Sequence, residues 1–340
     1  MSNIYEVARR AGVSNATVSR VLSRPDVVSA ATRHKVMQAV QDMGYTPNSA
    51  AKTLRTRRSE KILVTVPDIS NPFFSLILKG IQDAAQRDGY AVLLGDTQHD
   101  EAREEGYARM LQRKEADGLV FLGHRLPAAA AELARIMAPR CAPIVHGCEY
   151  SPRLGVPSVH IDNAKAAADA LDHLYSLGHR RVGIITGPLM SPLSRDRLQG
   201  ATDRAQAHGA SEGLMVARGD FTVESGAAAA EALLEWSAPP TALFCFNDMM
   251  AIGAIASARQ RGLHVPRDLS VIGFDDIRVA AFMDPPLTTV AQPMREIGEG
   301  AVRLLLEILR GDGIEPVSVT LPHRLTIRAS TAPAPRRAAV

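Results

Sequence analysis

From Lys61 onward, short apolar runs alternate with segments of helical periodicity, and no other feature constrains the fold of this chain so strongly. Strands separated by helices predict parallel sheets, because parallel strands need long crossover connections. The runs form two series, which predicts two lobes with one sheet each. We expect an α/β core over residues 61–330, with strands in KILVTVPDI, YAVLLGD, DGLVFLG, APIVHGC and PSVHID for the first lobe and in RRVGIITGP, GLMVARGDF, PTALFCFND and LSVIGFDD for the second.

Polar residues follow two strands of the second series. One strand ends on Asn247 and Asp248, and another ends on Asp275 and Asp276. Ligands of open parallel sheets bind beyond the carboxyl ends of the strands, so the cleft between the lobes is the expected site. Asp248 also has a plainer interpretation as the N-cap of the next helix. No strong helix follows Asp275, which makes it the better candidate for a residue of the cleft.

The first 46 residues predict three short helices. Asn3 and Glu6 have the spacing of a capping box, Gly12 supplies a tight turn, and Ser29 can cap the third helix. A helix, a three-residue turn and a second helix make the helix-turn-helix plan. We therefore expect residues 1–46 to form a DNA-binding head, although the same geometry also occurs as mere packing.

The second helix of this head, in VSNATVSRVL, carries small hydroxyl and amide side chains where a solvated helix usually carries Glu and Lys. In the helix-turn-helix plan this helix lies in the DNA major groove, where small polar side chains fit. The spacing predicts phosphate contacts for three residues and base contacts for three others. The first group is Ser14, Thr17 and Ser19, and the second is Asn15, Ala16 and Arg20.

The charge of the chain is concentrated at the same end. Residues 1–60 hold ten Lys or Arg against four Asp or Glu, a net +6, which leaves −3 for the other 280 residues. A basic head on a nearly neutral body favours a polyanionic partner. A solvated charged face would not explain why the charge is confined to one end.

The segment YTPNSAAKTLRTRR predicts a conditional helix between head and core. Pro47 suits a boundary, Asn48 can cap, and the two turns that follow are too short to be stable alone. A helix that forms only on DNA and carries one apolar wedge can open the minor groove. We expect residues 47–60 to be a hinge helix and linker, with a plain basic linker as the alternative.

Composition excludes several other classes. The chain has no run of about 18 apolar residues and no hydrophobic stretch at MSNIYEVARR, so a cytoplasmic protein that does not enter a membrane is expected. The three cysteines form no CxxC pair and the ten histidines are scattered, so neither a disulfide framework nor a metal site is indicated. Residues 331–340 are expected to be a disordered tail.

These motifs together resemble the LacI family of bacterial transcription repressors, and the resemblance covers nearly the whole chain. The most specific pieces are IYEVARRAGVSNATVSRVL, YTPNSAAKTL, VPDISNPFF, HIDN, DRLQG, FND, VIGFDD and DPPLTTVAQP. The resemblance implies a homodimer on a palindromic operator, hinge helices that insert Leu54, and a core similar to periplasmic sugar-binding proteins. It implies no cofactor. Arg57, beyond Leu54, is expected to contact phosphate.

Within the family the likeness is strongest to nucleoside-responsive repressors, which implies cytidine or another nucleoside as the effector. By position, Phe73 and Phe74 would lie against the ligand ring, and Arg197 and Asp275 would bind its hydroxyls. Cys148 stands where many relatives have Asp or Asn. The other residues implied for the effector site are Phe221 and Asn247, which would line the cleft, and Glu149, whose role stays open.

Three alternatives remain at this point. A LacI-type regulator that senses a sugar keeps the whole plan and changes only the ligand. An enzyme on the same fold has no support beyond the sheets, because the chain lacks a P-loop, a GxSxG elbow and a GxGxxG turn after a strand. A transport-type binding protein fits two lobes but not the basic head.

Overall fold

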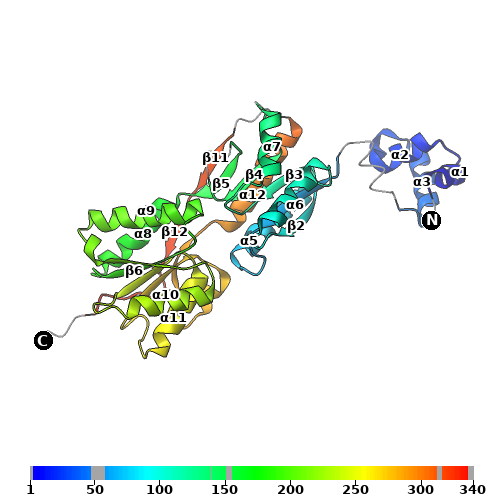
Figure 1. Cartoon of the computed structure of the whole chain (residues 1–340). Helices are drawn as coiled ribbons and strands as arrows, with labels where there is room; N and C mark the ends of the chain where they lie inside the picture. Colours follow the sequence, from blue (N-terminus) through cyan, green and yellow to red (C-terminus); the bar gives the residue numbers. More distant parts are fainter. Residues whose placement is uncertain (1–2, 47–57, 139, 151–154, 312–315, 336–340) are drawn as a thin grey trace. The chain divides into compact units, whose positions relative to one another are not determined.

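The computed structural model describes residues 3–46, 58–138, 140–150, 155–311 and 316–335. The chain divides into two compact units, with the boundary between Ser59 and Glu60. Figure 1 shows the head as the first unit and the two-lobed core as the second. Most of the predicted hinge helix lies outside the described residues, and with it Asn48, Leu54 and Arg57.

The described residues of the head form three helices and one short turn of 3-10 helix. The capping box predicted for Asn3 and Glu6 is present, and Gly12 ends the first helix with a φ of 67°. Ser14 caps the second helix and Ser29 caps the third. The apolar faces meet in a small core of Val7, Ala8, Val18, Val21, Val36 and Ala39. The elements are α1 (Ile4–Ala11), α2 (Asn15–Ser23), η1 (Pro25–Val27) and α3 (Ala30–Asp42).

The first lobe is a six-stranded parallel sheet covered by helices on both faces. Its strand order is β11-β5-β4-β3-β1-β2. Helices α5 and α12 pack on one face of the sheet, and α6 and α7 pack on the other. The strands are β1 (Lys61–Val66), β2 (Ala91–Asp96), β3 (Gly118–Phe121), β4 (Ile144–Cys148), β5 (Ser158–Ile161) and β11 (Ser318–Leu321), and the helices are α5 (Phe73–Arg87), α6 (Glu101–Gln112), α7 (Ala128–Met137) and α12 (Met294–Arg310).

The second lobe repeats this plan with the order β12-β10-β9-β8-β6-β7, in which only β12 runs antiparallel to its neighbour. Its strands are β6 (Val182–Thr186), β7 (Leu214–Arg218), β8 (Ala242–Cys245), β9 (Ser270–Asp275), β10 (Thr288–Ala291) and β12 (Arg324–Thr326). Its helices are α8 (Asn163–Ser176), α9 (Pro192–Ala207), α10 (Val223–Leu234), α11 (Asp248–Gln260) and the short η3 (Ser211–Gly213) and η4 (Arg278–Phe282).

The two lobes are not two consecutive pieces of chain. After β10 the chain returns to the first lobe, where it forms α12 and the edge strand β11, and then crosses back to form β12. Figure 1 shows this return as the orange helix α12 among the cyan and green elements of the first lobe. The sequence predicted two lobes but missed this return and the strands β10, β11 and β12. The chain therefore crosses between the lobes three times, after β5, after β10 and after β11.

Residues 331–335, which the sequence assigned to a disordered tail, are held against the second lobe instead. The backbone N–H of Ala332 donates to Ser270 Oγ at 3.1 Å, and the N–H of Ala334 donates to the carbonyl of Leu177 at 2.9 Å. These residues are ordered because their backbone groups have partners in the lobe, a nonlocal property that composition does not reveal. In the part of the chain that the structure describes, no helix has both the length and the apolar character needed to span a bilayer.

Candidate functional site

A cavity of about 780 Å³ lies between the lobes of the core. The ends of strands from both sheets surround it, as expected for open parallel sheets. All seven residues that the sequence assigned to the effector site line this cavity, together with further polar residues that no sequence motif had indicated. The first group is Phe73, Phe74, Glu149, Arg197, Phe221, Asn247 and Asp275, and the second includes Gln98, His99, His124 and Ser191.

Backbone strain concentrates around the cavity. Residues other than glycine rarely adopt a positive φ, and such strain is typical of functional sites. Five of the cavity residues adopt it, each at or shortly after the end of a strand, so the chain turns sharply where it meets the cavity. They are Gln98 (50°), His99 (56°), Cys148 (70°), Phe221 (74°) and Asp275 (113°).

Arg197 is a buried cation with a fixed orientation. Its side chain on α9 is 3% exposed, and its guanidinium carbon lies 3.5 Å from the centroid of the Phe274 ring. Nε donates to Asn163 Oδ1 at 2.8 Å, and Nη1 donates to the carbonyl oxygen of Phe246. Burial lowers the pKa of Arg197 to about 10, although nearby acids raise it, so the group stays charged at neutral pH. Two of its five N–H groups are used by these bonds, which leaves others for a ligand.

Asp275 provides an acid near this cation. It is the last residue of β9, it is 5% exposed, and its Oδ1 accepts a hydrogen bond from Gln292 Nε2 at 2.8 Å. Burial raises the pKa of the Asp275 carboxyl, and the charge of Arg197 offsets only part of that effect. The cavity thus combines a guanidinium donor with a carboxyl group, a set that can bind vicinal hydroxyls.

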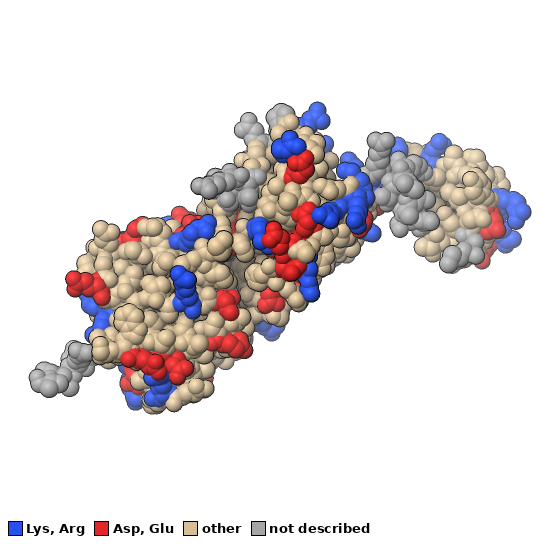
Figure 2. Space-filling model, viewed as in Figure 1, with Lys and Arg blue, Asp and Glu red and all other residues tan. Residues whose placement is uncertain are grey.

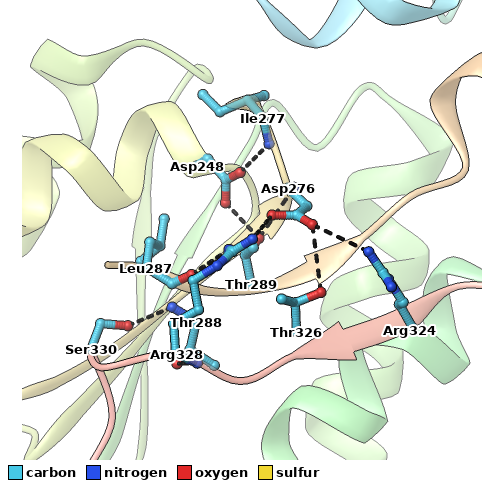
Figure 3. Close-up of polar contacts among 10 residues, drawn as sticks. All are labelled: Asp248, Asp276, Ile277, Leu287, Thr288, Thr289, Arg324, Thr326, Arg328 and Ser330. Atoms are coloured by element: carbon cyan, nitrogen blue, oxygen red, sulfur yellow. Dashed lines mark hydrogen bonds and ion pairs between the residues drawn. The ribbon is translucent and has the colours of Figure 1, made fainter. Parts of the chain in front are cut away.

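Polar contacts of Asp248 and Asp276 hold the turn that follows Asp275 in the chain (Figure 3). Asp248 accepts hydrogen bonds from the backbone N–H of Ile277 at 2.8 Å and from Thr289 Oγ1 at 2.6 Å. Asp276 bonds to Arg328 at 2.7 Å. The interpretation of Asp248 as a helix cap is wrong, because Asn247 caps α11 and Asp248 is the first helical residue, turned toward β10.

Asn247 and Phe221 act as a pair. While Asn247 Oδ1 accepts from the N–H of Met250 as the helix cap, its Nδ2 donates to the carbonyl of Phe221 at 2.9 Å. The Phe221 ring lies against Gly187, where an added Cβ would come within 2.1 Å of a ring atom. Asn247 is 2% exposed, and with these bonds it positions the loop that presents Phe221.

Two aromatic rings from the first lobe complete the cavity. Phe73 and Phe74 begin α5, and their rings meet edge to face with centroids 5.1 Å apart. The N–H of Phe73 donates to Asn71 Oδ1 at 3.0 Å, which anchors the start of the helix. Flat apolar faces at this place can pack against the ring of a ligand.

Glu149 follows β4 directly and connects the two lobes. Its Oε1 accepts a hydrogen bond from Ser191 Oγ at 3.0 Å, and Ser191 belongs to the start of α9 in the second lobe. Its Oε2 is buried and has no partner among the described residues. Burial raises the pKa of Glu149 to about 8. Among the described residues, no group of His, Cys, Asp and Glu side chains could hold a metal ion.

In the head, α2 turns Val18 and Val21 inward and its polar side outward. Ser14 Oγ accepts from the N–H of Thr17 at 3.2 Å, and the two hydroxyl oxygens lie 2.9 Å apart. One hydroxyl hydrogen of this pair is therefore used internally, so the pair can donate one hydrogen bond to a phosphate, not two. The structure leaves Ser14, Ala16 and Arg20 exposed and Asn15, Thr17 and Ser19 partly exposed.

Figure 2 shows how charge is distributed over the visible faces of the two units. On the core, Lys and Arg side chains lie intermixed with Asp and Glu. Residues 3–46 of the head contain six Lys or Arg against three Asp or Glu, and basic side chains lie at separate places on its visible face. The described head keeps the positive excess that a polyanion requires.

Known proteins match the chain in both units. Residues 3–48 match the bacterial regulatory proteins of the lacI family, and residues 171–331 match the periplasmic binding protein-like domain. The HTH-type transcriptional repressor CytR of Escherichia coli (strain K12) is 45% identical over 331 residues, which cover 97% of this chain and 96% of CytR.

Two solved structures are similar over the whole length. The lac repressor dimer bound to operator and the anti-inducer ONPF has a TM-score of 0.87 at 28% identity, covering 97% of this chain and 99% of that chain. The complex of the transcriptional regulator CelR with cellobiose has a TM-score of 0.72 at 32% identity, covering 97% of this chain and 100% of that chain.

Proposed function

Because the chain belongs to the lacI family of bacterial regulatory proteins and is a transcriptional repressor of that family, we propose that a nucleoside bound between its lobes controls its affinity for a palindromic operator. Its relatives are named as repressors and regulators, and it is not an enzyme. Since a repressor acts on chromosomal DNA, we also propose the cytoplasm as its location.

The nucleoside assignment rests on one observation, which is the set of groups that line the cavity. Arg197 and Asp275 offer a donor and a carboxyl group for the vicinal hydroxyls of a ribose, and the ring of Phe74 offers an apolar face for a base. The similarity to CytR and the resemblance to nucleoside-responsive repressors support the same ligand class. Cytidine is the first candidate, followed by other nucleosides.

The second candidate effector is a sugar. The regulator CelR, which is similar in structure over 97% of this chain, is in complex with cellobiose. Sugar hydroxyls could use Arg197 and Asp275 in the same way, and a sugar ring can also pack on an aromatic face. A binding experiment must therefore separate the two ligand classes.

The effector site supports a simple switch. Phe73, Phe74 and Glu149 belong to the first lobe, whereas Arg197 and Asp275 belong to the second, so a ligand that contacts both sets stabilises one arrangement of the lobes. To move the protein from mostly DNA-competent to mostly released, the ligand must prefer the released state by about 5.5 kcal/mol. A smaller preference for the released state is enough for partial release from the operator.

For the head, we propose that α2 enters the major groove with Arg20 and Asn15 at the base edges. Ala16 would contact a thymine methyl group. In a homodimer, two such heads would read the two halves of a palindrome, and Leu54 of each hinge would enter its centre. Arg57 would contact phosphate, and Asn48 would cap the hinge helix at the DNA. The similarity to the lac repressor dimer supports this arrangement.

Titration calorimetry with the full chain tests the effector. Cytidine, uridine, adenosine, ribose and cellobiose are compared, and Asp275→Ala serves as the binding-deficient variant. We expect heat with cytidine and none with the variant. Heat with cellobiose or ribose and none with any nucleoside would overturn the nucleoside assignment and leave the repressor assignment intact.

A further inference from the structure

Glu149 is a buried acid whose hydrogen bonding is incomplete. It is 6% exposed, it lines the cavity, and the left-handed turn at Cys148 sets its direction. Ser191 donates to Oε1, but Oε2 is buried without a partner in the described part of the chain. A buried polar atom without a partner costs about 1–3 kcal/mol, so this oxygen is suited to a ligand.

The charges around Glu149 do not cancel the effect of burial on the pKa of its carboxyl group. Among the described residues, no Lys, Arg or His nitrogen forms an ion pair with its carboxyl group, and the one hydrogen bond that the group accepts comes from a neutral hydroxyl. Arg195 and Arg197 on α9 favour the ionised form, whereas Asp196 on the same helix opposes it. Cys148 beside it is a buried thiol whose own pKa is raised by burial and by the acids Glu149 and Asp275.

A buried carboxylate with so few donors is strongly disfavoured relative to the neutral acid. The pKa of about 8 follows from this burial and is consistent with a proton on the group at neutral pH. In the neutral acid, Oε1 is the oxygen that accepts from Ser191, so Oε2, the atom without a partner, is the oxygen left to carry the proton. Glu149 lines the cavity, so the neutral acid places one O–H donor in the cavity wall.

We propose that Glu149 is a specificity-determining residue that binds the effector as a neutral carboxylic acid, donating from Oε2 to an acceptor atom such as a ring nitrogen or carbonyl oxygen of a nucleobase. This inference rests on the proposed nucleoside effector. A sugar hydroxyl can donate or accept and so fits either protonation state. An acceptor atom on a base fits only the protonated one, which couples effector binding to pH.

Two substitutions separate the neutral acid from an ionised one. Glu149→Gln keeps an N–H donor near Oε2 and a carbonyl oxygen for Ser191, whereas Glu149→Ala removes both. Cytidine affinity is measured by calorimetry from pH 6.5 to 9.5. At pH 7 we expect the Glu149→Gln chain to have a cytidine affinity within about threefold of the unmodified chain. The Glu149→Ala chain should bind cytidine at least about tenfold more weakly.

The pH profile gives an independent readout. Affinity of the unmodified chain should fall as pH rises through about 8, approaching tenfold per pH unit above that point. The Glu149→Gln chain lacks this fall, and because Asp275 is present in both, the difference between the profiles isolates Glu149. Glu132→Gln, an exposed acid on α7 that is paired with Arg135, is the matched control and should follow the unmodified chain.

Several outcomes overturn the proposal. If Glu149→Gln binds as weakly as Glu149→Ala, or if the affinity of the unmodified chain rises with pH relative to that of Glu149→Gln, Glu149 acts as an ionised acceptor. If the Ala variant fails to fold, the comparison of Gln with the unmodified chain still decides. Binding of ribose or cellobiose without binding of any nucleoside would instead refute the proposed function, and that result is visible in the unmodified chain alone.

Discussion

Arg197 lies over Phe274, with its guanidinium carbon 3.5 Å from the ring centroid. This contact and the bonds to Asn163 and the carbonyl of Phe246 hold the guanidinium in one place. A planar group that is fixed in advance loses little entropy when it binds a ligand. The cavity is therefore organised around a cation that a lysine cannot imitate.

Arg197→Lys should keep the charge but lose the ring contact and the fork of N–H donors. We expect effector affinity to fall about tenfold to a hundredfold, since hydrogen bonds to charged groups contribute about 1.5–3 kcal/mol. Operator affinity without effector should stay the same. Calorimetry and operator binding are both measured. The control is Arg204→Lys on the same helix, where the partly exposed side chain pairs with Asp172. Equal loss of operator binding would assign Arg197 to stability.

Gly187→Ala should disturb the effector site through Phe221. The new Cβ would lie 2.1 Å from the present position of the Phe221 ring, so the ring must move. We expect at least about tenfold weaker effector binding, which corresponds to about 1.4 kcal/mol. Gly106→Ala, at a helical position with no atom within 4 Å of the new Cβ, is the control and should be neutral or stabilising. Unchanged effector affinity in Gly187→Ala would argue against contact between Phe221 and the ligand.

The stability of the core should depend on pH through Glu149. Its pKa is about 8 in the folded chain and about 4.3 when unfolded, so the folded state binds the proton more tightly. The stabilisation that protonated Glu149 contributes is complete below its pKa in the unfolded chain. It is lost as the pH rises from there toward its folded-state pKa of about 8. Between these two pKa values, Glu149 alone lowers the free energy of unfolding by up to about 1.4 kcal/mol per pH unit.

Urea unfolding at pH 6, 7 and 8 measures this effect. The free energy of unfolding should fall with pH less steeply in Glu149→Gln than in the unmodified chain. Identical slopes in the two chains would show that Glu149 is already ionised in this range.

Arg20→Ala should change which DNA sequences are bound. Arg20 is exposed on α2, where it has the length and donor fork for a guanine edge. A bidentate contact of this kind discriminates by about 1–3 kcal/mol, so preference should relax at one base pair in each half-site. Selection from a random duplex library measures the preference, with Arg135→Ala in the core as the charge-matched control. Coinciding profiles for Arg20→Ala and the unmodified chain would exclude Arg20 as a reader.

Local rules predicted the parts of this fold that depend on neighbouring residues. The capping box of Asn3 and Glu6 and the cap at Ser29 need only residues within one turn of helix. Most strands of both lobes were predicted for the same reason, because their apolar runs are continuous. The strand ends also directed attention to Asp275, which lines the cavity.

Features that depend on contacts between residues far apart in the chain were not predicted from the sequence. β10 was missed because its buried positions include Thr288 and Thr289, whose hydroxyls are satisfied by residues far along the chain. The return of α12 to the first lobe depends on packing across the sheet, and the bond from Ser191 to Glu149 depends on how the lobes meet. Gln98, His99 and His124 could have been found, because they lie two or three residues beyond the ends of predicted strands.

We propose above that a nucleoside in the cavity sets the affinity of the head for its operator. Fluorescence anisotropy of a labelled operator duplex, titrated with the full chain with and without saturating cytidine, tests it most directly. We predict that cytidine weakens operator binding at least about tenfold in the unmodified chain. Asp275→Ala should bind the operator equally well without cytidine and fail to respond to it. If operator affinity is the same with and without cytidine, or if the Asp275→Ala chain still responds to cytidine, a nucleoside in this cavity does not control operator binding.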